Sequence, residues 1–328
     1  MNMSNKPQSA VTRRDFMRTT AVAGVAATVL PGSIGLAEET KKAAPKSETL
    51  VQAFHDTLTE EQKKDVSFDF DHPLRSKIDN NWHITKPRID RFFNKDQQAL
   101  IRDIFIHLHN PEYVDDVLKQ VEEDNDDGMG SCSVALFGEP GSGKFEFVFT
   151  GRHVTRRCDG DSVEGAAFGG PIFYGHSPRF REEPDHPGNV YWFQAKQANL
   201  LYQALDGKQQ EQALLNKARR ERGNKTVELK GKREGLAGLP VSDMSADQKD
   251  LVYKVMGDLI APFREEDGDE VMKIIKKTGI DDLHMSYYKG HDIGDDGVWD
   301  VFQIEGPSMI WYFRGWPHVH TWVNIRES

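Results

Sequence analysis

Helical and strand-like patterns occupy separate blocks of this sequence instead of alternating one by one. Helical periodicity covers residues 48–66, 95–109 and 111–124, and a strand-like block with glycine turns follows over 131–175. A second helical block covers 189–206, 209–222, 245–263 and 269–278, and strands close the chain over 282–288, 298–306, 309–313 and 318–325. We see no internal repeat. This order predicts an α+β domain whose mainly antiparallel sheet joins the central and C-terminal strand blocks, with helices packed around it.

A glycine-rich segment in the central block resembles a phosphate-binding loop. Gly138, Gly143 and Lys144 fit G-x-x-x-x-G-K-[ST], but Phe145 stands where the motif needs a Ser or Thr to bind Mg²⁺. The residues FEFVFTG then alternate with the period of a strand, so no helix begins there to hold phosphates. We therefore expect a β-hairpin with strands at 133–137 and 145–150, and no bound nucleotide.

The first 37 residues have the pattern of a twin-arginine export signal. Arg13 and Arg14 precede an alanine-rich apolar stretch and a small-residue cleavage site that ends at Ala37. We interpret residues 38–46 as a disordered linker and 47–328 as one α+β domain. We expect the twin-arginine machinery to export the folded protein, which would then be periplasmic or secreted. No other apolar run approaches the ~20 residues of a membrane span.

Charge and cysteine content limit the partners of this chain. Its net charge is −10, and removal of the signal would make it more acidic, because the signal carries more basic than acidic residues. Nucleic acid is therefore not expected as a partner, whereas a small-molecule ligand is compatible with the composition. Cys132 and Cys158 flank the hairpin and could form a disulfide after export or stay as two buried thiols.

The last strand carries the clearest indication of a site. Alternation along residues 318–325 places His318 and His320 on one face, expected to be polar, and apolar side chains on the other, expected to pack into the core. Two imidazoles with this spacing on a strand can bind one metal ion; alternatively, they face solvent. His107 and His109 have the same spacing but end a helical pattern, in which such side chains diverge.

Three more histidines lie beside glycine or aromatic residues in non-helical segments: His83, His153 and His176. Glycine lets a backbone approach a ligand closely. We expect His153 to meet His318 and His320, with a bulge at Gly151 turning its side chain toward them. His83 or His176 should complete or line the pocket. Such a cluster suits zinc, copper or iron as the cofactor.

Five motifs together resemble one protein family: NWHITKP, FGEP, GRH, FQIEGP and the terminal HVHTW. As a set they are similar to the exported bacterial proteins of domain of unknown function 3500, over about residues 54 to 324. The resemblance implies an exported α+β protein without an established reaction. His83, His153, His318 and His320 match the family pattern. Arg152 replaces a second histidine, and Trp322-Val323-Asn324 replaces an acidic WRD-like ending.

Two functions follow from these observations, and the sequence leaves both open. The first is a metal-dependent enzyme that acts on a small polar or carbohydrate-like substrate, with a metal-bound water as nucleophile. Asp159, Asp161 or Glu305 could add a carboxylate to its histidines. The second is a non-catalytic ligand-binding or accessory protein, in which aromatic side chains recognise the ligand and the histidines are structural.

Overall fold

The structure, a computed structural model, describes residues 46–177, 190–289 and 299–327. The predicted signal and all but the last residue of the predicted linker lie outside these ranges. Within them the chain forms nine α-helices, which are α2 (Lys46–Asp56), α3 (Glu60–Val66), α4 (Ile89–Phe92), α5 (Lys95–His107), α6 (Val114–Asp124), α7 (Trp192–Gln203), α8 (Gly207–Ala213), α9 (Ala246–Ile260) and α10 (Glu265–Thr278). None of these described helices is long and apolar enough to cross a lipid bilayer.

One sheet of eleven strands combines both strand blocks, which confirms the predicted α+β fold. Its order is β1-β2-β3-β4-β5-β11-β10-β9-β8-β6, and β7 pairs with β8 outside this path. All pairs are antiparallel except β1 with β2 and β6 with β8. The strands are β1 (Ser67–Phe68), β2 (Ser133–Gly138), β3 (Phe145–Gly151), β4 (Val154–Cys158), β5 (Ile172–His176), β6 (Leu214–Leu215), β7 (Leu239–Pro240), β8 (His284–Tyr288), β9 (Val301–Gly306), β10 (Met309–Arg314) and β11 (Val319–Ile325).

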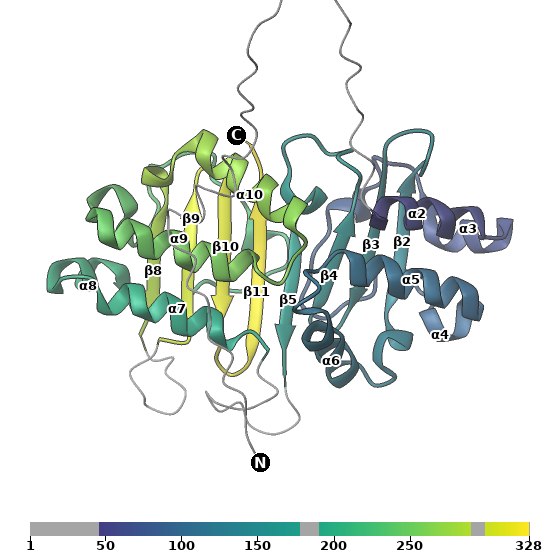
Figure 1. Cartoon of the computed structure of the whole chain (residues 1–328), viewed down its shortest axis with the longest axis horizontal. Coiled ribbons are helices and arrows are strands. Elements are labelled where there is room, and N and C mark those ends of the chain that lie inside the picture. Colours follow the sequence, from purple (N-terminus) through teal and green to yellow (C-terminus); the bar gives the residue numbers. More distant parts are fainter. Residues whose placement is uncertain (1–45, 178–189, 290–298, 328) are drawn as a thin grey trace, which may run out of the picture.

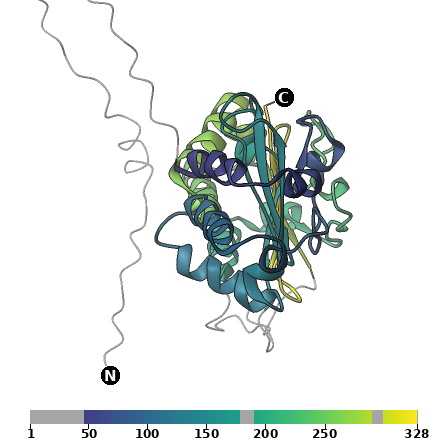
Figure 2. The same cartoon turned by 90° about the vertical axis from the view of Figure 1, so that its right-hand side faces the viewer.

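Both faces of this sheet are covered. The long helices pack on one face, and loops with short elements pack on the other (Figure 2). On the helix face α2, α5 and α6 share one apolar core with β2 to β4, and α7, α9 and α10 share another with β8 to β11. On the opposite face Trp322 of β11 is fully buried beside Phe173 and Tyr312. The expectation that this face of the last strand is polar and outward is therefore wrong, because residues 78–84 and 215–229 help to cover this side of the sheet.

The glycine-rich segment forms the predicted hairpin. Strands β2 and β3 pair in register from Ser133 with Thr150 to Gly138 with Phe145. Gly138 has a φ of 73°, and Glu139 donates its backbone N–H to the carbonyl of Lys144 to close the turn. The chain continues from Lys144 directly into β3, so no helix N-terminus faces the loop. Cys132 and Cys158 are both buried free thiols.

The two halves of the chain repeat one order of elements, a structural similarity that the sequence pattern did not indicate. Apart from α4 in the first half and β7 in the second, the first half runs α2, α3, β1, α5, α6 and then the meander β2 to β5, and the second runs α7, α8, β6, α9, α10 and then β8 to β11. In each half a two-residue strand pairs in parallel with the first strand of the meander. The halves lie side by side and join through their last strands, β5 and β11 (Figure 1).

Paired glutamines show the repeat at the level of single residues. Gln62 and Gln97 occupy the third positions of α3 and α5 in capping boxes, and their side-chain amides donate to each other at 3.0 Å. Gln209 and Gln248 do the same at the starts of α8 and α9, with amide distances of 3.0 and 2.8 Å. Each of these four amides also donates to a backbone carbonyl from a neighbouring turn. In each half, the same pair of glutamine contacts therefore holds together the starts of two corresponding helices, α3 and α5 in the first half and α8 and α9 in the second.

Two expected helices differ from the observed ones. The pattern at 48–66 is divided into α2 and α3, because Thr59 caps a new helix by accepting the backbone N–H of Gln62. The pattern at 209–222 ends at Ala213, where the chain enters β6 and pairs with β8. Pairing to the sheet edge outweighs the helical propensity of the residues that follow.

Candidate metal centre

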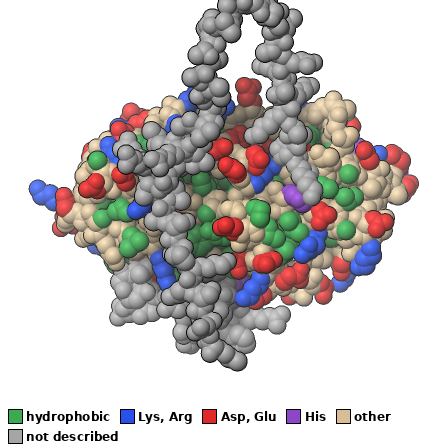
Figure 3. Space-filling model, viewed as in Figure 1, with side chains coloured by type: hydrophobic (Ala, Val, Ile, Leu, Met, Phe, Trp, Pro, Cys, Tyr) green, Lys and Arg blue, Asp and Glu red, His purple; other side chains and the backbone are tan. Residues whose placement is uncertain are grey.

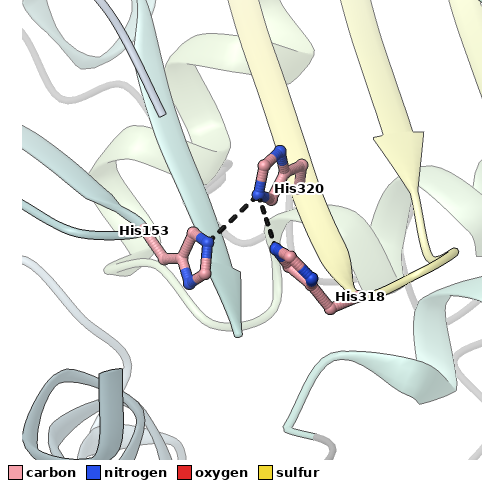
Figure 4. A group of neighbouring side chains, drawn as sticks. All are labelled: His153, His318 and His320. Atoms are coloured by element: carbon pink, nitrogen blue, oxygen red, sulfur yellow. Dashed lines mark hydrogen bonds between the residues drawn. The ribbon is translucent and has the colours of Figure 1, made fainter. Parts of the chain in front are cut away.

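Three histidines from separate segments meet at one end of the central strands. His318 precedes β11, His320 lies within it, and His153 lies in the turn between β3 and β4 (Figure 4). The Nε2 atom of His320 is 2.9 Å from that of His318 and 3.0 Å from that of His153. His153 and His320 are only 3% and 5% exposed, whereas His318 is partly exposed. The site therefore opens toward solvent on the His318 side.

A left-handed backbone conformation directs His153 into the site. The connection from Gly151 to Val154 is a two-residue turn, and His153 has a φ of 58°. Its backbone N–H donates to the carbonyl of Asn80, and its carbonyl accepts the N–H of Gly175. A non-glycine residue in this region is strained and persists when its surroundings fix it. The turn, and not the expected bulge at Gly151, therefore orients this imidazole.

Strand register places the imidazole of His320, and His318 lies two residues before it, just before the start of β11. His320 lies opposite Gly175 of β5 and opposite Arg314 of β10. A side chain on Gly175 would come within 2.1 Å of the Val319 carbonyl oxygen and 3.5 Å of the His153 Cβ. Glycine at this position thus lets the chain segments that carry the histidines approach each other.

Two carboxylates hold the ring nitrogens that face away from the centre. His153 Nδ1 lies 3.0 Å from Asp124 Oδ2 at the end of α6, and His320 Nδ1 lies 2.7 Å from Glu221 Oε2. A carboxylate accepts a hydrogen bond from Nδ1–H, so each neutral ring presents the Nε2 lone pair to the centre. Such carboxylate–histidine pairs commonly orient metal ligands.

Burial keeps the three imidazoles neutral. Desolvation lowers the pKa of His318 to about 3, with further contributions from the neighbouring histidines and from Arg314 and Arg152. Burial also lowers the pKa of His320 and of His153, and for His153 it outweighs the opposing effect of Asp124. Burial alone would raise the pKa of Asp124, but hydrogen bonds from His153 and His176 lower it below its ordinary value. Neutral imidazole is the form that binds a metal.

The other two predicted site residues lie outside this group of three. His176 is fully buried, and its Nδ1 lies 3.4 Å from the same Asp124 oxygen that binds His153. It therefore contacts the centre through a shared carboxylate. His83 is exposed, and burial of part of its ring together with Arg88 lowers its pKa. Asp124, Glu221 and Asn80 are site residues that sequence reasoning missed, because they come from a helix end and two loops whose burial depends on the fold.

A separate groove of about 850 Å³ lies on the helix face between α5 and α6 of the first half and α9 and α10 of the second. His107 and His109 line it, together with Phe263 and Arg264, and none of the three clustered histidines does. Seen from this side, the surface mixes hydrophobic side chains with charged side chains of both signs (Figure 3). The candidate metal centre is thus distinct from this groove.

Among the described residues, His153, His318 and His320 form the one group with metal-ligand geometry, because one ligand atom from each lies within 4.8 Å of the others. The group could hold a metal ion. Comparison with known proteins adds a family assignment. The model of a family described as "Protein of unknown function (DUF3500)" matches residues 40–327. Neither curated proteins nor solved structures gave a significant match to this chain.

Proposed function

The chain belongs to the DUF3500 family, and from its site we propose that it is an exported metal-dependent enzyme whose metal is held by three histidines. His153, His318 and His320 would bind a divalent transition metal through their Nε2 atoms. Zinc fits this set of neutral nitrogen ligands best, with copper and iron as the alternatives. The substrate would be a small polar molecule, for which a metal-bound water supplies the nucleophile.

The observation that carries this proposal is the close approach of two imidazole nitrogens whose rings each contact a carboxylate through the opposite ring nitrogen. With the Nδ1–H of each neutral ring donating a hydrogen bond to Asp124 or Glu221, Nε2 of His153 and Nε2 of His320 are both acceptors. They nevertheless lie 3.0 Å apart in a buried site. Two lone pairs at this distance repel each other unless a cation lies between them. Tetrahedral zinc with Zn–N distances of about 2.0–2.1 Å would place such nitrogens about 3.3 Å apart.

The second half of the chain serves as an internal control for the role of these residues. The turn from Gly306 to Met309 has the same two-residue length as the turn from Gly151 to Val154, and it places Ser308 at the position that His153 has in the first half. The hydroxyl groups of Ser308 and of Thr278, at the end of α10, share a hydrogen bond. This contact takes the place of the one between His153 and Asp124 at the end of α6. The scaffold therefore closes this turn without an imidazole or a carboxylate, which favours a functional role for both groups.

The number of ligands favours catalysis over a purely structural ion. A structural zinc site is closed by four protein ligands, whereas catalytic sites leave one position for water or substrate. Here three protein ligands converge and the third, His318, is partly exposed. An ion in this position would have its open side toward solvent.

Metal analysis of the purified protein tests the proposal. We expect about one zinc, copper or iron ion per chain in the wild type and none in His320→Ala. His107→Ala is the matched control, because His107 belongs to a histidine pair of the same spacing outside the cluster and should leave the metal content unchanged. Absence of metal from wild-type protein after reconstitution with Zn²⁺ would contradict the proposal and favour a ligand-binding or accessory protein with structural histidines.

A further inference from the structure

Two arginines flank the histidine cluster. Arg314 lies directly opposite His320 in the β10–β11 register and so projects from the same face of the sheet. Arg152 occupies the turn position before His153, and its side chain is exposed. Both arginines are therefore direct neighbours of cluster histidines, Arg314 across the strand pair and Arg152 along the chain.

Arg314 has hydrogen-bonding capacity beyond its structural contact. Its Nε lies 3.0 Å from Glu221 Oε1, and this carboxylate binds His320 through its other oxygen. Its Nη2 is buried and has no hydrogen-bond partner in the described part of the chain, while the side chain as a whole is 21% exposed. Buried donors are rarely left unpaired, and one beside a ligand site commonly awaits a ligand atom or water.

The fold itself holds Arg152 in place. Asn125 accepts the backbone N–H of Arg152 through Oδ1 at 2.9 Å and donates to its carbonyl through Nδ2 at 3.3 Å. Asn125 follows Asp124, so two consecutive residues fix the turn and the imidazole beside it. Arg152 therefore has an anchored backbone next to His153 and an exposed side chain.

The charges around the cluster leave the metal uncompensated. Asp124 and Glu221 contact the clustered imidazoles through Nδ1 atoms, not through the Nε2 atoms that face the centre, and two arginines lie beside the same imidazoles. A divalent ion would add two positive charges that no described ligand neutralises. An open metal position flanked by two guanidinium groups is a preferred environment for an oxyanion.

The other half of the chain again lacks these features. The turn position of Arg152 corresponds to Pro307, and the strand position of Arg314 corresponds to Asp159, from the register of the two hairpins. Neither arginine is thus required by the repeated scaffold. Both occur only at the end of the sheet that carries the histidines.

We infer that the substrate carries an oxyanion, a carboxylate or a phosphate, which Arg152 and Arg314 hold beside the metal. This inference rests on the proposed function. The oxyanion would lie on the exposed side of the cluster, near His318, with one guanidinium on each side. Hydrogen bonds to charged groups contribute more than neutral ones, so each arginine should contribute measurably to affinity.

The test uses the full chain loaded with Co²⁺, whose visible absorption reports changes at the metal. Acetate and inorganic phosphate are titrated as separate probes, and acetamide serves as the uncharged analogue of acetate. Arg152→Gln and Arg314→Gln should each weaken binding of the preferred oxyanion by about tenfold or more. Arg152→Lys and Arg314→Lys should recover part of the affinity by keeping the charge. Arg326→Gln is the control, because Arg326 lies outside the cluster.

The outcomes separate the two proposals. If wild-type protein binds no Co²⁺, the proposed function fails and this inference fails with it. If Co²⁺ binds but both glutamine variants retain wild-type affinity for acetate and for phosphate, only the oxyanion inference is overturned. Equal binding of acetamide and acetate overturns it too. Arg314→Gln also removes a contact to Glu221, so its Co²⁺ affinity is measured first, and Arg152→Gln tests the inference without that contact.

Discussion

Asp124 links more of the site than any other single residue described above. One of its oxygens contacts the rings of His153 and His176, and the other accepts the backbone N–H of Ser177. Its side chain is fully buried. It thus joins the end of α6 to the turn between β3 and β4 and to the end of β5.

Asp124→Asn should therefore weaken metal binding without removing a ligand. Loss of an outer carboxylate typically lowers metal affinity 10–100-fold, because the neutral amide oxygen of asparagine is a weaker acceptor for the Nδ1–H of His153 than a carboxylate is. Competition with a chromophoric chelator measures this change. Asp126→Asn, at an exposed position two residues later, should bind metal as the wild type does. Equal affinities in both variants would show that Asp124 is only structural.

A second residue-scale prediction concerns pH. Burial and the nearby Asp159, Asp267 and Asp161 raise the pKa of Glu270 from 4.5 to about 7. The folded state thus binds a proton that the unfolded state releases, so this group's contribution to stability is present below pH ~4.5 and is lost as pH rises toward 7. Wild-type protein should lose stability relative to Glu270→Gln as pH rises from about 4.5 to about 7. Urea unfolding at several pH values measures this difference. Glu266→Gln, at an exposed position of the same helix, should show the same pH dependence of the free energy of unfolding as the wild type.

The sequence indicated the histidine ligands better than the carboxylates that orient them. Alternation along the last strand predicted that His318 and His320 share a face, and glycine-rich surroundings marked His153. Glu221 lies in a charged segment that reads as a solvated helix and loop, yet its side chain is only 15% exposed. Its burial follows from packing of that segment against β11, which no local pattern contains.

At the scale of elements, the turn between β3 and β4 determines whether the cluster forms. His153 adopts a φ of 58°, where asparagine is tolerated and β-branched residues are strained. His153→Asn should keep stability within about 1 kcal/mol of the wild type, whereas His153→Val should cost about 1–3 kcal/mol. Chemical denaturation measures both. Both variants should lose the metal, so a stable His153→Asn that still binds metal with wild-type affinity would remove this residue from the ligand set.

Element boundaries were predictable where capping chemistry and alternation agree. The hairpin β2–β3 and the strands β8 to β11 lie where alternation placed them. The end of the helix expected over 209–222 was not predictable, because Leu214 and Leu215 pair with Tyr287 and Tyr288 from a distant segment. Burial of both faces of β11 was likewise missed, because the covering residues lie far away in the sequence.

At the scale of the whole molecule, two similar halves share one sheet but carry different chemistry. Only the first half has an imidazole in its hairpin turn, and the second contributes His318 and His320 from its final strand. The cluster therefore requires both halves and forms only when β5 pairs with β11. The repeat was hidden in the sequence because few positions, such as Gln97 and Gln248, keep the same residue in both halves.

Export remains a proposal that concerns the whole chain. Arg13 and Arg14 fit the twin-arginine pattern, and that route accepts only folded proteins. Replacing both by lysine should leave the precursor in the cytoplasm with its leader uncleaved. Immunoblots of cytoplasmic and exported fractions measure this. Normal export of the double-lysine variant would contradict the twin-arginine route.

The central claim is that one metal ion is bound by three imidazoles from the two halves, and X-ray absorption spectroscopy of the zinc-reconstituted protein tests it most directly. The account predicts three nitrogen ligands at about 2.0–2.1 Å and one oxygen ligand from water, with loss of this signal in His153→Ala and in His320→Ala. Sulfur ligands, or an unchanged spectrum in those two variants, would contradict it.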